Sequence, residues 1–176
     1  MWSTSKIHNG LRRTLIVISW IPVAMTVNEH ICYVAKIEGS SMRPTLNPNE
    51  TIPSDWVLLW KWGVQDAMNL RYNDVILFKA PYNPTKVYCK RIKGVQFDSV
   101  STNYPYPREI VQIPRNHVWV EGDNTFHSID SNTFGPISTG LVLGKVAMVL
   151  WPPSRWGSQI DQSGGRGDIR VRDMRF

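Results

Sequence analysis

A serine at the end of a predicted strand could act as a nucleophile. Ser41 lies in the segment Gly-Ser-Ser-Met-Arg-Pro-Thr at 39–45, directly after an apolar run. Pro44 stiffens this turn, and Gly39 lacks a Cβ, so a second chain could approach the backbone there. We therefore expect an exposed Ser41 hydroxyl beside a free backbone N–H, although serine and proline are also common in ordinary turns.

A lysine in a second segment could act as a general base. Lys90 lies in Val-Tyr-Cys-Lys-Arg-Ile-Lys at 87–93, where strand alternation puts it on one face with Tyr88 and Ile92. Burial between apolar neighbours lowers the pKa of a lysine and leaves the amine neutral enough to accept a proton. The alternative is a surface lysine whose ammonium reaches water.

A third segment, residues 121–132, is rich in Asp, Asn, Ser and Gly, which favours a tight loop held by side-chain hydrogen bonds. His127 with Asp123 or Asp130 could imitate a metal site or a Ser/His/Asp triad. Neither alternative is favoured, because no H-x-x-x-H pair and no G-x-S-x-G motif accompanies these residues.

Short strands must position these segments. Period-two apolar runs separated by turn residues predict strands at 33–38, 55–62, 74–79, 86–95, 110–113, 117–121 and 141–150. No convincing helical period lies between residues 36 and 156. The pattern predicts a mainly β fold, an antiparallel β-sandwich or a partly closed barrel.

The N-terminus predicts a membrane anchor. Residues 1–13 are basic, and an apolar segment over 14–35 follows, with Pro22 tolerated in a membrane helix. A cleaved signal and a buried core helix are the alternatives. Arg12 and Arg13 precede the apolar segment, and basic residues tend to stay on one side of a membrane. They predict that the N-terminus stays on the side that retains basic residues while the rest of the chain crosses.

Composition excludes several classes. With 42% hydrophobic and 19% charged residues, the chain should fold. The net charge of +6 gathers at the ends, which disfavours a nucleic-acid surface. Cys32 and Cys89 form no C-x-x-C motif, which disfavours a zinc site and leaves a single disulfide bridge open.

A β domain is expected over 36–156, and a solvated polar tail without chemistry over 157–176.

In this order the three segments resemble the type I signal peptidase family of Ser/Lys proteases. The resemblance runs from about Ile16 to Gly157 and includes Asp-Val-Ile-Leu-Phe-Lys at 74–79 and Leu-Trp-Pro-Pro-Ser-Arg-Trp at 150–156. It implies the family's β fold with one N-terminal transmembrane helix.

The resemblance also implies roles for residues. Ser41 would attack the scissile carbonyl, and Lys90 would take its proton. Ser128 matches the hydroxyl that orients the lysine, and Asp130 matches an acid that organises the loop. The Ser41 backbone N–H matches one oxyanion donor. No metal and no cofactor is implied.

Two departures separate the chain from the bacterial members that it resembles. Gly39 stands where those proteins often carry a hydroxyl, so the second oxyanion donor stays open, with the Ser40 hydroxyl as the alternative. Asn132 stands where they commonly carry arginine, which resembles the mitochondrial branch of the family. Gly39 and Met42 are the candidates for contact with the approaching substrate.

The resemblance implies a serine endopeptidase in the mitochondrial inner membrane, single-pass, with its catalytic domain in the intermembrane space. It would remove sorting peptides from precursor proteins and assemble with a second, related protease subunit and membrane lipid. One alternative is a membrane-tethered, non-catalytic β subunit that supports an active partner. A self-cleaving Ser/Lys repressor would require a DNA-binding helical module upstream, where this chain has an apolar segment.

Overall fold

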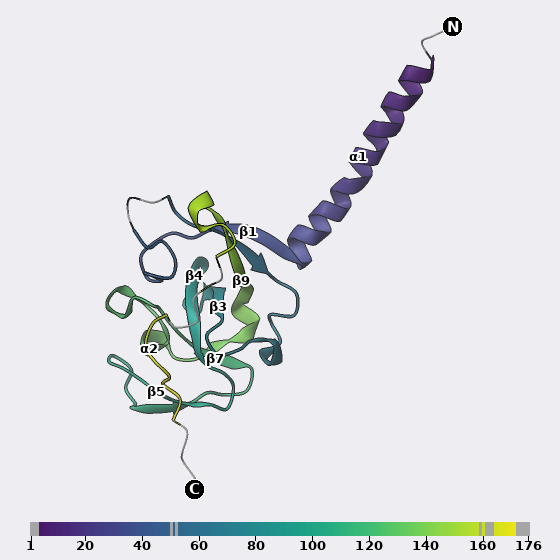
Figure 1. Ribbon diagram of the computed structural model, residues 1–176. Helices are drawn as coiled ribbons and strands as arrows, with labels where there is room; N and C mark the ends of the chain where they lie inside the picture. Colours follow the sequence, from purple (N-terminus) through teal and green to yellow (C-terminus); the bar gives the residue numbers. More distant parts are fainter. Residues whose placement is uncertain (1–3, 50, 52, 159, 161–163, 172–176) are drawn as a thin grey trace.

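The computed structural model describes residues 4–49, 51, 53–158, 160 and 164–171, and the side chains only from residue 12 onward. It consists of one long helix, α1 (Thr4–His30), and a β domain. Figure 1 shows α1 projecting away from the β domain, with the N-terminus at its far end.

Antiparallel strand pairs build the domain. The larger sheet has the order β1-β2-β9-β3-β4-β7-β8. Its strands are β1 (Cys32–Lys36), β2 (Trp56–Trp60), β3 (Val75–Ala80), β4 (Asn83–Gly94), β7 (His117–Glu121), β8 (Ile137–Ser138) and β9 (Val142–Trp151). A second sheet pairs β5 (Ser99–Ser101) with β6 (Ile110–Gln112). Short helical turns follow at η1 (Ala67–Asn69), η2 (Thr125–His127), α2 (Ser131–Phe134), η3 (Thr139–Leu141) and η4 (Pro153–Arg155).

The predicted antiparallel, mainly β fold is confirmed. β1 and β8 lie at opposite ends of the larger sheet, so the described strands form no closed barrel. All seven predicted strands are present, and β5, β8 and α2 were not predicted. β4 begins at Asn83, earlier than predicted, because Asn83 already pairs with Ala80 across the hairpin.

Three apolar clusters form the core. The first lies under β1, β2, β3 and β9, and the second under β3, β4, β7 and β9. The third packs β5, β6 and Trp119 together with Ile169 from the C-terminal segment. The site segments are anchored in this core by Met42, Leu46 and Ile92, each at most 2% exposed.

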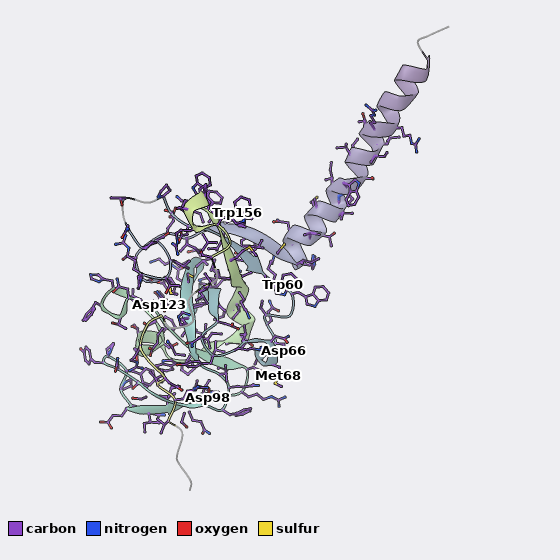
Figure 2. The ribbon with its side chains drawn as sticks, viewed as in Figure 1. Trp60, Asp66, Met68, Asp98, Asp123 and Trp156 are labelled. Carbon is purple, nitrogen blue, oxygen red and sulfur yellow. The ribbon has the colours of Figure 1, made fainter. Side chains whose placement is uncertain are left out.

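The N-terminal helix differs from its prediction. It begins at Thr4, inside the basic segment, and ends at His30, while Cys32–Lys36 pair with β2. Its apolar side chains from Leu15 to Met25 are largely exposed, and Figure 2 shows the side chains along α1 standing clear of the domain. Of the helices in the described part of the chain, none is both long and apolar enough to span a membrane. The predicted transmembrane helix is therefore not supported.

Two further expectations can be compared with the structure. Cys32 and Cys89 are both free thiols, so the bridge left open by the sequence is not formed. Residues 164–171 pack on the β domain, where Ile169 is 7% exposed, in contrast to the expected solvated extension.

Candidate active site

Ser41 lies in the turn that follows β1. Asn47 stabilises this turn from inside, because its side-chain amide donates to the carbonyl oxygens of Ile37 at 2.9 Å and Gly39 at 3.2 Å. Gly39 has φ +90°, a conformation that side chains with a Cβ rarely adopt. The glycine is thus required by the backbone of the turn, and Ser41 is held half-buried just beyond it.

The loop of residues 121–130 packs directly on the Ser41 turn. The backbone N–H of Asn124 donates to the carbonyl oxygen of Ser41 at 3.0 Å, and its side chain donates to that of Ser40 at 3.2 Å. Gly122 lies between the two segments: a Cβ there would be 2.7 Å from the Ser41 carbonyl oxygen and 2.3 Å from Ser128 Oγ. No larger residue fits this position without displacing one of them.

Lys90 is buried on β4. Its side chain is 3% exposed, its residue pairs with Ile76 of β3, and its Nζ lies 5.8 Å from the centre of the Tyr88 ring. Burial lowers the pKa of Lys90 below its ordinary value, while Cys89, Asp130 and Asp123 act in the opposite direction. The burial predicted from strand alternation is confirmed, and the role of Lys90 as base stays a prediction.

Asp130 organises the loop. It is 5% exposed, and one carboxylate oxygen accepts the Gly122 N–H at 3.1 Å. The other accepts the backbone N–H and the side-chain amide of Asn132, each at 3.1 Å, so that Asp130 caps α2. Together these hydrogen bonds of Asp130 fix the path of the chain on both sides of Ser128.

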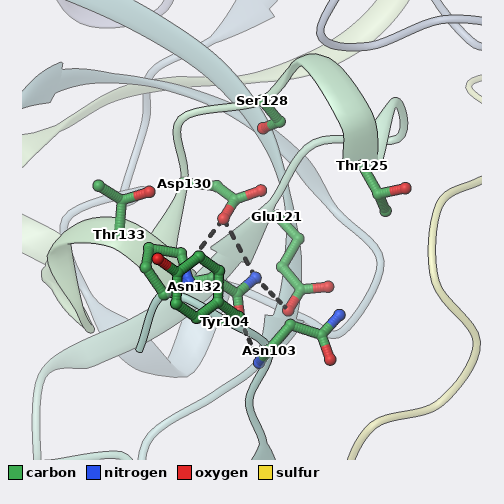
Figure 3. Close-up of a pocket in the computed structure, with 9 residues that line it drawn as sticks. Asn103, Tyr104, Glu121, Thr125, Ser128, Asp130, Asn132 and Thr133 are labelled. Atoms are coloured by element: carbon green, nitrogen blue, oxygen red, sulfur yellow. Dashed lines mark hydrogen bonds between the residues drawn. The ribbon is translucent and has the colours of Figure 1, made fainter. Parts of the chain in front are cut away.

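Ser128 has a buried hydroxyl without a hydrogen-bond partner among the described residues. It lines a cavity of about 90 Å³, shown in Figure 3, together with Asn103, Tyr104, Pro105, Glu121, Thr125, Asp130, Asn132 and Thr133. A buried hydroxyl without a partner is costly, so a group that satisfies Ser128 during the reaction would be favoured.

Sequence reasoning missed the ion pair beneath this loop. Arg91 points to the opposite face from Lys90 and binds Asp123 through two hydrogen bonds of 2.8 and 2.7 Å, with both side chains fully buried. Thr45 donates to the same carboxylate at 2.5 Å. The Asp123 carboxylate thus binds Arg91 and Thr45, and His127 lies exposed on η2. This arrangement does not favour a metal site or a triad built from His127 and Asp123. The alternation that places Lys90 also places Arg91, and this was the signal that could have revealed the pair.

A cleft of about 220 Å³ lies beside the Ser41 turn and Lys90. Its lining comes from residues 36–38, which precede Gly39, from residues 87–89, which precede Lys90, and from Leu77 of β3. These lining residues are Lys36, Ile37, Glu38, Leu77, Val87, Tyr88 and Cys89. Met42, in contrast, is 2% exposed within the first core cluster. Its predicted contact with substrate, like that of Gly39 and the oxyanion role of Ser40, stays a prediction.

Comparison with known proteins identifies the family. The family model described as "Signal peptidase, peptidase S26" matches residues 11–106 and 99–151. The chain belongs to this signal peptidase family.

Named relatives agree with this assignment. The chain is 60% identical over 163 residues to mitochondrial inner membrane protease subunit 2 of Saccharomyces cerevisiae, covering 92% of each chain. It is 34% identical over 134 residues to mitochondrial inner membrane protease subunit 1 of Schizosaccharomyces pombe, covering 76% of this chain and 83% of that protein. A crystal structure of a signal peptidase I from Enterococcus faecalis aligns with a TM-score of 0.37 and 20% identity, covering 44% of this chain and 96% of that one.

Four residues predicted for the site lie near one another, although their roles stay predictions. Ser41, Lys90, Ser128 and Asp130 all border the 121–130 loop or belong to it. Ser41 contacts the loop through Asn124, and Lys90 interacts electrostatically with Asp130 of the same loop.

Proposed function

We propose that this protein is a serine endopeptidase of the mitochondrial inner membrane that removes sorting peptides from precursor proteins delivered to the intermembrane space. Ser41 is the nucleophile and Lys90 the general base. The observation that carries the proposal is a lysine buried to 3% exposure, with a lowered pKa, beside a loop hydrogen-bonded to the peptide unit of a serine.

The reaction needs an uncharged amine. Neutral Lys90 accepts the proton of the Ser41 hydroxyl while its oxygen attacks the carbonyl carbon of the scissile bond. The Ser41 backbone N–H stabilises the resulting oxyanion, and such a donor contributes about 3 kcal/mol. The ammonium of Lys90 then protonates the departing amine, which leaves an ester between Ser41 and the new C-terminus.

Hydrolysis of this ester completes the cycle. Lys90, neutral again, takes a proton from a water molecule that attacks the ester carbonyl, and returns it to the Ser41 oxygen as the C–O bond breaks. The products are the sorting peptide with a free carboxylate and the mature protein with a new N-terminus. Every proton transfer in this scheme passes through one amine.

Ser128 and Asp130 act by positioning. The unpartnered Ser128 hydroxyl supports a role as hydrogen-bond partner of the Lys90 amine, which would otherwise turn freely. Asp130 supports that role indirectly, because its bonds to Gly122 and Asn132 hold the loop on both sides of Ser128.

The cleft beside the site supports an extended, small-residue substrate. Its apolar lining includes Ile37, Leu77 and Cys89, and its volume of about 220 Å³ suits short side chains. β1 ends the larger sheet, so its outer edge has no strand partner in the described part of the chain. An extended peptide could add to that edge by main-chain hydrogen bonds.

The membrane and partner assignments rest on the relatives and on α1. The named relatives are mitochondrial inner membrane proteases, and they occur as subunits 1 and 2, which supports a hetero-oligomer with a related subunit. The exposed apolar side chains of α1 support attachment to the membrane. Trp60 and Trp156, exposed at the end of the domain nearest α1 in Figure 2, would lie at the same interface.

Replacement of the two reacting groups tests this function. Ser41→Ala and Lys90→Met should each leave precursors uncut in mitochondria that lack the wild-type chain, at normal levels of the variant protein. Lys79→Met, at an exposed position of β3, is the matched control and should process normally. Normal processing by both site variants, with loss of processing on deletion of the chain, would instead favour the non-catalytic supporting subunit.

A further inference from the structure

The C-terminal segment returns to the β domain. Val100 and Arg170 form an antiparallel bridge, the Ser101 N–H donates to the Ile169 carbonyl at 2.9 Å, and the Val171 N–H donates to the Ser99 carbonyl at 2.8 Å. Residues 169–171 thus pair with β5, and Figure 1 shows the yellow end of the chain, residues 164–171, running down to that strand. We call residues 164–171 the C-terminal clasp.

Gly164 closes over the buried ion pair that supports the 121–130 loop. A Cβ at this position would lie 2.4 Å from Asp123 Oδ2, 2.6 Å from Arg91 Nη2 and 2.6 Å from Thr45 Oγ1. Its carbonyl oxygen accepts a hydrogen bond of 2.9 Å from Lys93 Nζ. The backbone of the clasp is therefore in direct contact with Asp123, and no side chain fits between them.

Arg166 binds the residue at which the loop begins. Its Nη2 donates to Glu121 Oε1 at 2.7 Å and to the Ser101 carbonyl at 2.6 Å. Glu121 is 2% exposed, and the same oxygen accepts from the Asn132 side chain at 3.1 Å. Arg166 therefore neutralises a buried carboxylate that joins the start of the loop to Asn132, just beyond its end.

We propose that the C-terminal clasp holds the 121–130 loop in its working position, with Gly164 and Arg166 as positioning residues for the cleavage reaction. This inference rests on the proposed function of the site. The clasp contacts the loop at Glu121 and Asp123, and Ser128 and Asp130 lie farther along the same loop. The contacts of Gly164 and Arg166 described above are with these loop residues and their neighbours, and not with Ser41 or Lys90.

Loss of the clasp has a chemical consequence. Without Arg166 the buried Glu121 carboxylate lacks its counter-charge, which is costly in a site screened from water. The loop would relax toward solvent, Ser128 would move, and water would enter beside Lys90. A more hydrated Lys90 holds its proton more strongly, so a smaller fraction of the enzyme is in the neutral, active form.

Two matched pairs of variants test the clasp, assayed on the full chain in its membrane with its native partners and a synthetic precursor peptide. Gly164→Ala is compared with Gly167→Ala, whose Cβ meets no atom within 4 Å. Arg166→Ala is compared with Arg170→Ala, whose side chain pairs with Asp168 and stacks on Tyr72. Arg166→Lys restores the charge.

We expect Gly164→Ala and Arg166→Ala to lower kcat by about 10- to 100-fold, with KM changed by less than about twofold. The acid limb of kcat/KM should move to higher pH in both. Arg166→Lys should recover part of the rate, and the two controls should match the wild type. Amide hydrogen exchange over residues 121–132 should be faster in Gly164→Ala and Arg166→Ala than in the wild type, and unchanged in Gly167→Ala and Arg170→Ala.

Several outcomes would overturn the inference. If Gly164→Ala and Arg166→Ala have the same kinetics as their controls while Ser41→Ala is inactive, the clasp has no positioning role and the proposed function still holds. A loss of activity only in proportion to folded protein, with an unmoved pH profile, would reduce the clasp to a general stabiliser. If Ser41→Ala is active, the proposed function fails. Unchanged hydrogen exchange in Gly164→Ala and Arg166→Ala would then also show that the clasp does not hold the loop.

Discussion

The backbone N–H of Asn124 donates a hydrogen bond of 3.0 Å to the carbonyl oxygen of Ser41. This bond fixes the peptide unit of the proposed nucleophile to the 121–130 loop. The same loop carries Asp123, which is held by Arg91, the neighbour of Lys90 on β4. Ser41 and Lys90, the two groups proposed to react, are distant in the sequence but are both linked to this one loop.

Gly122 should be irreplaceable at the point where the loop meets the turn. In Gly122→Ala the new methyl group would overlap Ser128 Oγ at 2.3 Å and the Ser41 carbonyl oxygen at 2.7 Å, so the two segments must separate. Misplacement on this scale lowers kcat by about 100-fold. Gly140→Ala, whose nearest atom is 3.6 Å away, is the control in the same peptide-cleavage assay. Equal rates for the two variants would contradict the predicted packing.

Ser128 should support activity at a cost in stability. Ser128→Ala removes a buried hydroxyl that has no partner in the described structure, so the free energy of unfolding should rise by about 1 kcal/mol while kcat falls. Ser131→Ala should instead lower the free energy of unfolding by about 1–3 kcal/mol without the fall in kcat, because Ser131 Oγ accepts the Val120 N–H at 2.9 Å. Denaturant unfolding and kcat, measured on both variants, separate the two roles. Unchanged kcat in Ser128→Ala would exclude it from the site.

Lys90→Met should be more stable than the wild type at neutral pH. Because burial lowers the pKa of Lys90 below 10.5, the unfolded chain binds more protons than the folded chain between the folded-state pKa and 10.5. The penalty for the lysine is therefore full below its folded-state pKa and disappears as the pH rises past 10.5. The stability gained by Lys90→Met should shrink over that window, measured by unfolding at several pH values beside Lys79→Met. A less stable Lys90→Met at neutral pH would count against a desolvated lysine.

The Arg91–Asp123 pair should be a strong determinant of folding. Asp123→Asn leaves a fully buried guanidinium without its charge partner, which costs about 3–5 kcal/mol. Lys145→Met breaks the more exposed pair with Asp74 and should cost less than about 1 kcal/mol. Thermal unfolding of the two variants compares these costs. A small effect of Asp123→Asn would mean that the loop does not depend on this ion pair.

Local patterns predicted the strand that carries Lys90 and the strand that precedes the Ser41 turn. The alternation of Tyr88, Lys90 and Ile92 with Arg91 placed the lysine on a buried face, and Arg91 does point to the other side. β5 and β8 were missed because strands of three and two residues are too short for a period-two pattern to be recognised.

Long-range contacts could not be read in the same way. Gly164 and Arg166 lie in a polar, glycine-rich segment that resembles a solvated tail, and only their partners Asp123 and Glu121 show that it packs. The predicted strand at 33–38 overlapped the segment 14–35 that was assigned to the anchor and its junction, because an apolar run fits a helix or a strand equally well. Its pairing with β2 decides the matter.

In the proposed mechanism the Lys90 amine is uncharged and directed at the Ser41 hydroxyl. An experimental structure of the full chain tests it most directly through the separation of Ser41 Oγ and Lys90 Nζ. We predict about 2.6–3.2 Å, or slightly more without substrate. A Lys90 amine directed into bulk solvent, beyond hydrogen-bond reach of Ser41 even through one water molecule, would exclude Lys90 as the base that activates Ser41.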